Sequence, residues 1–342
     1  MKILELFGGI GACTSALKRL HIDFEIADYV EIDKYAVASY NAINGTHFET
    51  QDIRNWNKDI EVDLIMHGSP CQDFSLAGYG KGGDEGSGTR SSLMYETIRI
   101  VNNLKPKYVI WENVKNLISK KHRHNFDNYL QALNEGGYRN YWQVLNARDY
   151  GTPQNRERVF VISIRNDLKQ DFNFPQKQEL RLTLKDLLEE NVDEKYILND
   201  KQIERILTTN YISGGVQRIQ EEICGTLCAR DYKDPKCVRI KNNTRKGYLE
   251  AYDGDGINIC GRMEYQRGNV QRQSIGTIDH QGGNNKGVLL HGKIRKLTPK
   301  ECWRLMGFAD EEFEKASQVN SNTQLYKQAR KFNSCKCANR NI

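Results

Sequence analysis

The sequence has no apolar run that approaches the roughly 18 residues of a membrane span. Its first seven residues do not have the layout of a secretory signal peptide, because Glu5 interrupts a very short apolar stretch. The nine cysteines are an odd number in a chain without such a signal, which favours reduced thiols in a cytoplasmic protein over a disulfide framework. Charge of one sign is not in large excess either: the net charge of +6 is compatible with nucleic-acid binding but does not require it.

The length of 342 residues is enough for about two domains with real cores. In the first half, short apolar strand patterns alternate with helical spacing, for example at 14–20 and 93–104. This alternation predicts an α/β fold with a doubly wound, mostly parallel sheet, in which ligands bind outside the carboxyl ends of the strands. The predicted strands are 3–7, 24–30, 62–66, 108–111, 142–145 and 159–164.

Residues from about 170 to 293 differ from the rest of the chain in composition and in pattern. This segment is rich in polar residues, Gly, Asn, Arg and Tyr, and it shows no steady alternation of strands and helices. A second, smaller domain fits this composition. Helical spacing returns at 298–306, where Thr298 is expected to cap a helix, with Pro299 in its first turn and Glu301 completing a capping box.

The first two strands end in residues that suit a nucleotide-like ligand. Gly8, Gly9 and Gly11 follow the first strand, where glycine allows a tight turn and close approach of the backbone to a ligand. Glu31 ends the second strand, where a carboxylate can bind ribose hydroxyls. The alternative is an ordinary turn with a solvated acid, since Thr14 breaks the full dinucleotide fingerprint.

The third strand is followed by Cys71, which a strand end would expose to a cleft as a possible thiolate nucleophile. A lone cysteine is more often a small buried apolar residue. Here, however, Pro70 precedes it and a glycine-rich stretch, 78–88, follows it, which is typical of a lid rather than of a core.

Charged residues stand next to two of the predicted strands in the sequence, at the end of the fourth and before the sixth. Glu112 ends the fourth strand and is a candidate acid or base, unless it only caps the next helix. Arg156 and Arg158 precede the sixth strand and could bind anions or donate to a carbonyl. Alternatively, the two arginines form a surface ion pair with Glu157 between them.

The cysteines at 224, 228, 237 and 260 include one C-x3-C pair and no second tight pair. This spacing does not favour a zinc site, and we expect no bound metal.

Six motifs occur in an order that resembles the DNA cytosine-5 methyltransferase family. They are FGGIG, EIDKYA, GSPCQDFS, ENV, QNRERV and RKLTPKECWRLMGF. The resemblance covers residues 1–165 and 294–329 and suits the small bacterial or phage enzymes. It implies a catalytic domain at 1–169 with a Rossmann-like sheet of the S-adenosylmethionine-dependent type, a target recognition domain at 170–293, and a return to the catalytic domain at 294–329.

The resemblance also implies a role for individual residues. Cys71 would be the nucleophile that adds to C6 of cytosine, Glu112 would hold the N3/N4 edge of the base, and Arg158, with Arg156 nearby, would contact O2. The residues expected to border S-adenosylmethionine are Phe7, Gly9, Gly11, Glu31, Ile32, Asp52, Ile53, Pro70 and Leu93.

The family implies duplex DNA as the partner, a monomeric enzyme and, in some cases, a cognate restriction endonuclease. A target base must leave the duplex to be reached, at a cost of a few kcal/mol.

One alternative is an RNA cytosine-5 methyltransferase of the same fold, and another is a DNA-binding remnant that has lost its activity. A nicotinamide dehydrogenase would share the fold but leaves residues 70–72 unexplained.

The resemblance stops at Arg330, where the family has Gly-Asn-Ser followed by an apolar helix. Residues 330–337 can be written in codons that, after removal of one base, read Gly-Asn-Ser-Ile-Val-Val-Ser-Val. We therefore hypothesise a single-base insertion near codon 330. We expect the resulting tail, 330–342, to be poorly ordered and the chain to be less stable, because an apolar helix would be lost from one face of the sheet.

Overall fold

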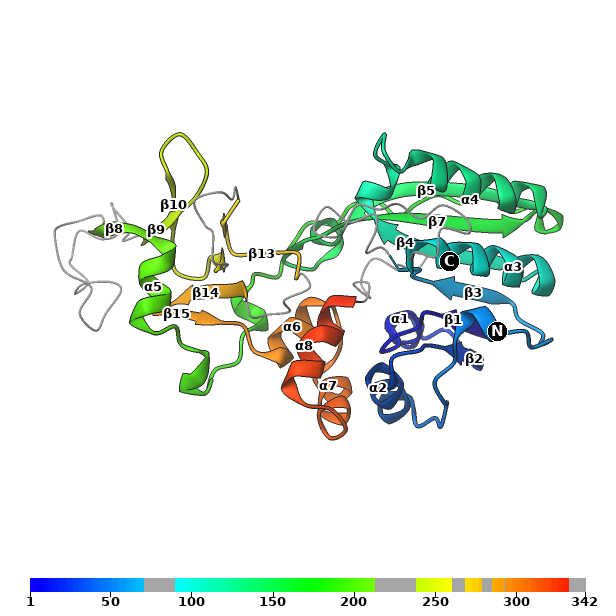
Figure 1. Cartoon of the computed structure of the whole chain (residues 1–342), viewed down its shortest axis with the longest axis horizontal. Coiled ribbons are helices and arrows are strands. Elements are labelled where there is room, and N and C mark those ends of the chain that lie inside the picture. The colour runs from blue at the N-terminus through cyan, green and yellow to red at the C-terminus, as the bar shows by residue number, and fades with distance from the viewer. Residues whose placement is uncertain (71–89, 213–237, 260–267, 279–284, 292, 332–342) are drawn as a thin grey trace.

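The computed structural model describes residues 1–70, 90–212, 238–259, 268–278, 285–291 and 293–331. These residues form two lobes (Figure 1). The large lobe contains a six-stranded sheet with helices on both faces, and the small lobe contains short strands from the segment 207–296. The last three helices lie beside the first two helices of the large lobe, so the chain leaves this lobe and comes back to it.

The sheet of the large lobe confirms the predicted α/β architecture. All six predicted strands are present, with ends shifted by a few residues, and their order is β2-β1-β3-β4-β7-β5. β1, β2, β3 and β4 are parallel to one another, whereas β7 is antiparallel to both β4 and β5. The strands are β1 (Lys2–Leu6), β2 (Glu25–Val30), β3 (Leu64–His67), β4 (Tyr108–Val114), β5 (Tyr138–Asn146) and β7 (Glu157–Arg165).

Both faces of this sheet are apolar, which is why its strands read as nearly continuous hydrophobic runs. In β4, Val109 and Trp111 join the core on one face, whereas Tyr108 and Ile110 pack on the other. The first face is covered by α3 (Met94–Leu104) and α4 (Arg123–Glu135). The second face is covered by α1 (Ala12–Arg19), and α2 (Lys34–Asn44) packs beside β2.

The three helices that follow the small lobe are anchored to the large lobe by polar contacts. Thr298 caps α6 with the predicted capping box to Glu301, and Pro299 stands in the first turn. Further on, the side chain of Gln328 accepts a hydrogen bond from Ser39 of α2 and donates one to the carbonyl of Tyr35. The helices are α6 (Pro299–Leu305), α7 (Asp310–Ser317) and α8 (Asn322–Lys331).

The small lobe is built from short strands around its own buried cluster. α5 (Asp200–Ile206) precedes these strands, and the cluster includes Ile240, Ile257 and Ile294. One sheet has the order β10-β9-β8 and the other β12-β11-β14-β15. The strands are β8 (Leu207–Ile212), β9 (Val238–Lys241), β10 (Tyr248–Ala251), β11 (Gly256–Asn258), β12 (Val270–Gln271), β14 (Lys286–Leu290) and β15 (Lys293–Lys296).

A two-stranded parallel pairing joins the lobes. β13 (Ile275–Gly276) of the small lobe pairs with β6 (Gln154–Asn155), which directly precedes β7. Among the described residues, no helix combines the length and the apolar character needed to cross a membrane.

Candidate active site

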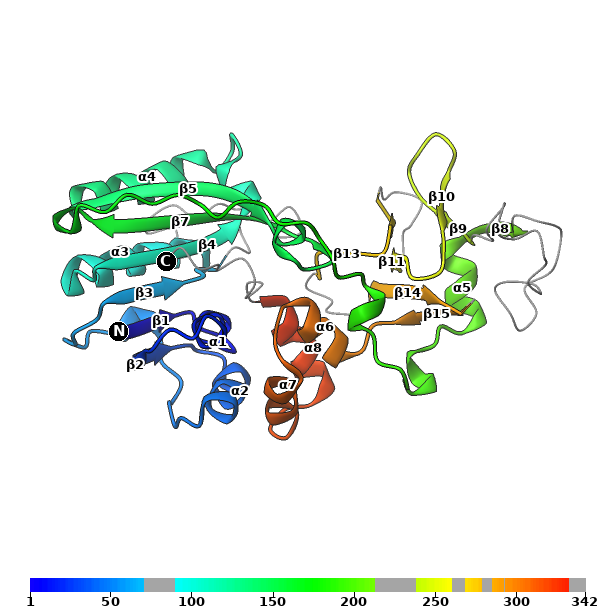
Figure 2. The same cartoon turned by 180° about the vertical axis from the view of Figure 1, so that it is seen from behind.

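The carboxyl ends of the parallel strands form the edge of the large lobe that faces the small lobe (Figure 2). This is the edge at which ligands bind in sheets of this kind. The predicted site residues that the structure describes are distributed along it, and they form two groups: one around the ends of β1 and β2, and one around the ends of β3 and β4.

The glycine-rich turn lies at the end of β1. Phe7, Gly9 and Gly11 all have positive φ values, of 53°, 56° and 83°, so the turn uses the backbone conformation that glycine adopts most easily. The backbone N–H of Gly9 donates to Glu31 Oε2 at 3.2 Å, and the N–H of Asp33 donates to Glu31 Oε1 at 2.8 Å. The structure therefore brings Glu31 directly beside the turn.

Three further residues predicted to border the cofactor lie near this turn. Ile32 is 65% exposed, which is unusual for a large apolar side chain and leaves it open to a flat ligand. The chain then returns to the strand end, because the N–H of Gln51 donates to the carbonyl of Glu31 at 2.9 Å. Asp52 and Ile53 follow directly, and the side chain of Ile53 is buried in the main core.

The carboxylate of Asp52 is already engaged by a neighbour. Arg54 Nε donates to Asp52 Oδ1 at 3.0 Å, and this hydrogen-bonded ion pair is the main cause that holds the pKa of Asp52 below its usual value. The carboxylate is therefore ionised at neutral pH and able to accept a hydrogen bond from a ligand. Leu93, at the start of α3, packs against the same core as Ile53 and is only partly buried.

The end of β3 is held by two donors that we did not anticipate from the sequence. Trp111 Nε1 donates to Ser69 Oγ at 3.0 Å, and Asn113 Nδ2 donates to the carbonyl of Ser69 at 3.2 Å. Trp111 and Asn113 flank Glu112, so strand alternation directs both toward the same face, and this pattern could have revealed them. Pro70 is half-buried; Cys71 and the stretch 78–88 lie outside the described residues.

A buried histidine supports this arrangement. His67 lies at the end of β3, its ring stacks on Trp111 with centroids 5.8 Å apart, and its Nε2 is 2.8 Å from the hydroxyl of Tyr129. Burial lowers the pKa of His67 to about 3, so the ring is neutral at physiological pH. His67 thus contributes packing and a hydrogen bond, not charge.

Glu112 and Arg158 meet at the ends of β4 and β7. Arg158 Nε is 3.0 Å from Glu112 Oε1, and both side chains are largely buried. Arg158 precedes its predicted strand, yet it reaches the carboxyl edge because β7 is antiparallel and Arg158 pairs with Val114 in register. The alternative ion pair with Glu157 is wrong for Arg158, since the carboxylate of Glu157 binds Lys115 at 2.9 Å.

Arg156 differs from Arg158 in its surroundings. It is 3% exposed, and its backbone N–H donates to Asn146 Oδ1 at 3.0 Å. It directly follows β6, the strand that pairs with the small lobe. The structure therefore places Arg158 beside Glu112 and Arg156 at the junction of the lobes.

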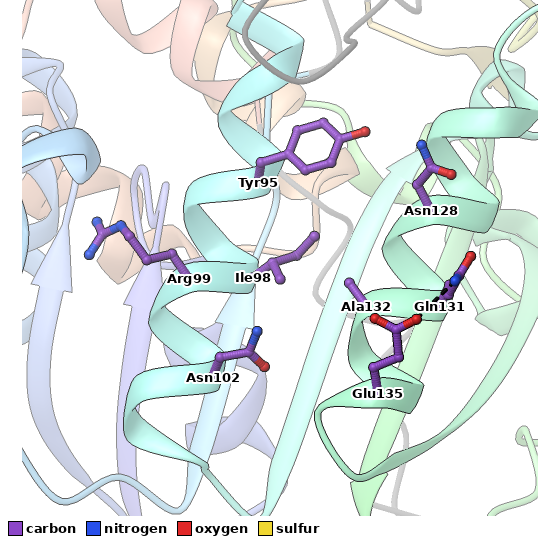
Figure 3. A pocket seen from close by; sticks show the side chains of 8 residues that line it. All are labelled: Tyr95, Ile98, Arg99, Asn102, Asn128, Gln131, Ala132 and Glu135. Carbon is purple, nitrogen blue, oxygen red and sulfur yellow. Dashed lines mark hydrogen bonds between the residues drawn. The ribbon is translucent and has the colours of Figure 1, made fainter.

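A hollow of about 410 Å³ lies elsewhere, between α3 and α4 (Figure 3). None of its lining residues is among the predicted site residues, and its polar side chains are partly engaged with each other, as in the hydrogen bond from Gln131 to Glu135. The residues that line it are Tyr95, Ile98, Arg99, Asn102, Asn128, Gln131, Ala132 and Glu135.

The described part of the chain contains no group of His, Cys, Asp and Glu side chains that could hold a metal ion. The cysteines at 224, 228, 237 and 260 lie outside that part. The residues around the glycine turn do fit S-adenosylmethionine: two carboxylates, at Glu31 and Asp52, flank an exposed apolar side chain at a tight turn.

Comparison with known proteins is consistent across sequence and structure. Residues 1–330 match the family model described as C-5 cytosine-specific DNA methylase. The type II methyltransferase M2.ScrFI of Lactococcus lactis subsp. cremoris is 33% identical, and the alignment covers 96% of this chain and 94% of that protein. The type II methyltransferase M.HhaI of Haemophilus parahaemolyticus is also 33% identical, with 96% of this chain and 89% of that protein covered.

Solved structures share the fold at lower identity. The Dnmt2 methyltransferase of S. pombe matches with a TM-score of 0.60 at 16% identity, over 98% of this chain and 95% of that one. A putative DNA modification methyltransferase encoded within an E. coli prophage matches with a TM-score of 0.55 at 20% identity, over 97% of both chains.

Proposed function

The chain belongs to the C-5 cytosine-specific DNA methylase family, and from this premise we propose that it transfers a methyl group from S-adenosylmethionine to C5 of a cytosine within a specific duplex DNA sequence. It is an enzyme of the cytosine-5 methyltransferase class. The cofactor, the covalent route and the DNA substrate are parts of the proposal.

The observation that supports this route most is the Glu112–Arg158 pair. Both side chains stand at the carboxyl edge of the sheet, 3.0 Å apart, and Asn113, next to Glu112, is bonded to the backbone two residues before Cys71. An acid, a cation and the chain leading to a thiol are thus anchored to neighbouring strands. This is the set of groups that a nucleophilic attack on a pyrimidine needs.

In the proposed route, the thiolate of Cys71 forms a bond to C6 of a flipped-out cytosine. Attack breaks the aromaticity of the ring and moves electrons toward N3 and C5, so that C5 can form its bond to the methyl group. Glu112, in its protonated form, donates at N3, and Arg158 donates to O2, which together stabilise the developing negative charge. A water molecule then takes the C5 proton, the Cys71 thiolate leaves C6, and Glu112 takes back the proton from N3, which restores the aromatic ring.

S-Adenosylmethionine supplies the electrophilic methyl group in this route. The residues that would hold it are those around the glycine turn. Glu31 presents its carboxylate at the position expected for ribose hydroxyls, Asp52 offers an acceptor to an amino group, and Ile32 offers an apolar surface to a flat ring. Gly9 and Gly11 let the backbone approach closely.

The experiment that tests the proposal compares two substrates. The purified chain is given S-adenosylmethionine with a labelled methyl group and either duplex DNA or tRNA, and bisulfite sequencing of the DNA product identifies the modified cytosines. We expect label in DNA at one short sequence. Label only in tRNA would support the RNA enzyme instead, and label in neither would contradict the proposal.

A second candidate, a DNA-binding remnant without activity, is favoured by one observation: the family match ends at residue 330. Up to this point α8 is well packed, since Tyr326 donates to the carbonyl of Leu297 at 2.6 Å and Trp303 donates to that of Leu325 at 3.0 Å. Calorimetry separates the candidates, because a remnant gives no heat with S-adenosylmethionine. The gene's nucleotides test the cause, since codons 330–337 that do not yield Gly-Asn-Ser after loss of one base would exclude a frameshift.

A further inference from the structure

Two tyrosines lie directly beneath the glycine turn. Tyr29 comes from β2 and Tyr40 from α2, and their rings stack with centroids 3.8 Å apart and planes inclined by 23°. Both side chains are completely buried. Neither belongs to the residues that the sequence pattern assigns to a ligand, and their contact ties the helix to the strand that precedes it.

The rings occupy the space that the missing glycine side chains leave open. A methyl group added to Gly8 would lie 2.7 Å from Cε2 of Tyr29, and one added to Gly11 would lie 2.9 Å from Cδ2 of Tyr40. Real Cβ atoms do not approach other atoms so closely. The tyrosine pair therefore leaves no room for a side chain at Gly8 or Gly11, and at Gly11 the φ of 83° also favours glycine.

The polar ends of the tyrosines are also used. The hydroxyl of Tyr29 donates to the carbonyl of Gly9, whose N–H is bonded to Glu31. The hydroxyl of Tyr40 is 3.2 Å from Thr14 Oγ1, and Thr14 in turn donates to the buried carboxyl of Glu5. Burial raises the pKa of both tyrosine hydroxyls, so they stay protonated and keep these bonds at all physiological pH values.

We propose that Tyr29 and Tyr40 are positioning residues for the methyl donor: the stacked pair sets the path of the 8–11 turn, and Tyr29 holds the carbonyl of Gly9 so that the N–H of the same residue stays directed at Glu31. This inference rests on the proposed function, because it assigns a role at the same cofactor site. It makes the shape of that site depend on side chains that touch no ligand.

The first test removes one hydroxyl and keeps the ring. Tyr29→Phe is expected to raise the Kd for S-adenosylmethionine about threefold to tenfold, measured by calorimetry, because the carbonyl of Gly9 loses its buried donor. The matched control is Tyr138→Phe, which removes a comparable buried bond, from Tyr138 to the carbonyl of Pro106 at 2.7 Å. The control is expected to lower the melting temperature and to leave the Kd unchanged.

The second test is a double-mutant cycle between Gly8 and Tyr29. Gly8 has no positive φ, so Gly8→Ala introduces a clash with Tyr29 but no forbidden backbone conformation. We expect Gly8→Ala to raise the Kd at least about tenfold in the native background and less than about threefold when Tyr29 is already replaced by Leu. An equal loss in both backgrounds means that Gly8 faces the cofactor directly, and it would overturn the inference.

The outcomes distinguish this inference from the proposed function. A wild-type chain that binds no S-adenosylmethionine contradicts the proposed function. A wild-type chain that binds it, together with an unchanged Kd in Tyr29→Phe, contradicts only the role of the tyrosines. If Tyr29→Leu does not fold, Tyr40→Phe provides the second measurement, since it keeps the stack and removes the contact with Thr14; an unchanged Kd in both Phe variants then counts against the inference.

Discussion

The two lobes use the chain in different ways. The large lobe is organised by one continuous sheet with strands of up to nine residues, and its site residues stand at strand ends. The small lobe consists of strands of two to six residues around a compact apolar cluster. Chemistry that needs fixed distances suits the first architecture, and under the proposed function the second would carry the contacts to DNA.

The lobes meet just before the arginines of the candidate site. The N–H of Ile275 donates to the carbonyl of Pro153, and the hydroxyl of Thr277 donates to that of Asn155, both at 3.0 Å. Arg156 and Arg158 follow directly. The contact with the small lobe therefore lies within a few residues of the start of β7, where Arg158 meets Glu112.

The largest effect is expected from Cys71→Ser in the large lobe. A hydroxyl is a far weaker nucleophile than a thiolate, so methyl transfer should fall below detection while DNA binding remains. Label incorporation and a gel-shift measurement check both parts. Cys302→Ser serves as the control, since Cys302 is fully buried in the core around α6. Full activity of the Cys71 variant would remove this residue from the mechanism.

A smaller loss is expected from Glu112→Gln. The amide cannot supply a proton at N3, and removing a general acid slows a reaction by about 100-fold or more. The rate of covalent capture of a duplex that contains 5-fluorocytosine measures this step. Glu157→Gln removes another carboxylate from the same edge, one that binds Lys115, and should leave the rate nearly unchanged. Equal rates in wild type and Glu112→Gln would exclude the acid role.

A third change addresses the small lobe alone. Arg245 and Lys246 are exposed in the turn between β9 and β10. Replacing both by Gln should weaken DNA binding about tenfold at moderate salt, and the slope of log K against log salt should become shallower by about one for each phosphate that is no longer neutralised. The Kd for S-adenosylmethionine should not change. A weaker affinity for the cofactor would show that the lobes are not functionally separate.

The junction gives a weaker effect. Thr277→Val removes the hydroxyl that donates to the carbonyl of Asn155 and keeps the shape of the side chain. We expect kcat to fall about threefold, as for the loss of one hydrogen bond, with little change in DNA or cofactor affinity. Steady-state kinetics on a cognate duplex show whether kcat falls while the affinities for DNA and cofactor stay the same. A change confined to DNA affinity would mean that the hydrogen bond serves recognition and not the arginines.

The smallest effect concerns acid stability of the large lobe. The hydrogen bond from Arg304 is the main cause that lowers the pKa of Asp310 from 3.8 to about 2. A depressed carboxyl pKa stabilises the folded state above the unfolded value and loses this contribution as the pH falls toward 2. Asp310→Asn should therefore reduce stability slightly at pH 6 and flatten its decline between about pH 4 and 2 in urea titrations. An unchanged acid profile would show that solvent screens this pair.

The sequence could predict those parts of the molecule that depend on local pattern. Spacing and residue type predict the turns after strands at Gly9 and Glu31, the helix cap at Thr298 and the carboxylate at Glu112. The contact between Glu112 and Arg158 could not be derived in this way, because it depends on β7 running antiparallel to its neighbours. The rule that ligands bind beyond the carboxyl ends of parallel strands points to residues that follow a strand. Arg158 lies at the start of β7, so this rule does not point to it.

Other features depend on tertiary packing and leave little trace in the sequence. The stack of Tyr29 on Tyr40 requires knowledge of how α2 lies against β2. Strand alternation places Trp111 and Asn113 on one face of β4, but their partner, Ser69, is identified only by the position of β3 beside β4. The short strands of the small lobe, such as β12 and β13, are too brief for a periodic pattern to develop, so their pairing is set by long-range contacts.

The most direct test of the central claim is to identify the residue that becomes bound to DNA. The chain is incubated with S-adenosylmethionine and a duplex carrying 5-fluorocytosine at the target position, and the trapped complex is digested and analysed by mass spectrometry. We predict that the pyrimidine is attached to the peptide that contains Cys71, through its sulfur. Attachment to another cysteine, or methylation of ordinary DNA without any trapped complex, would contradict the account.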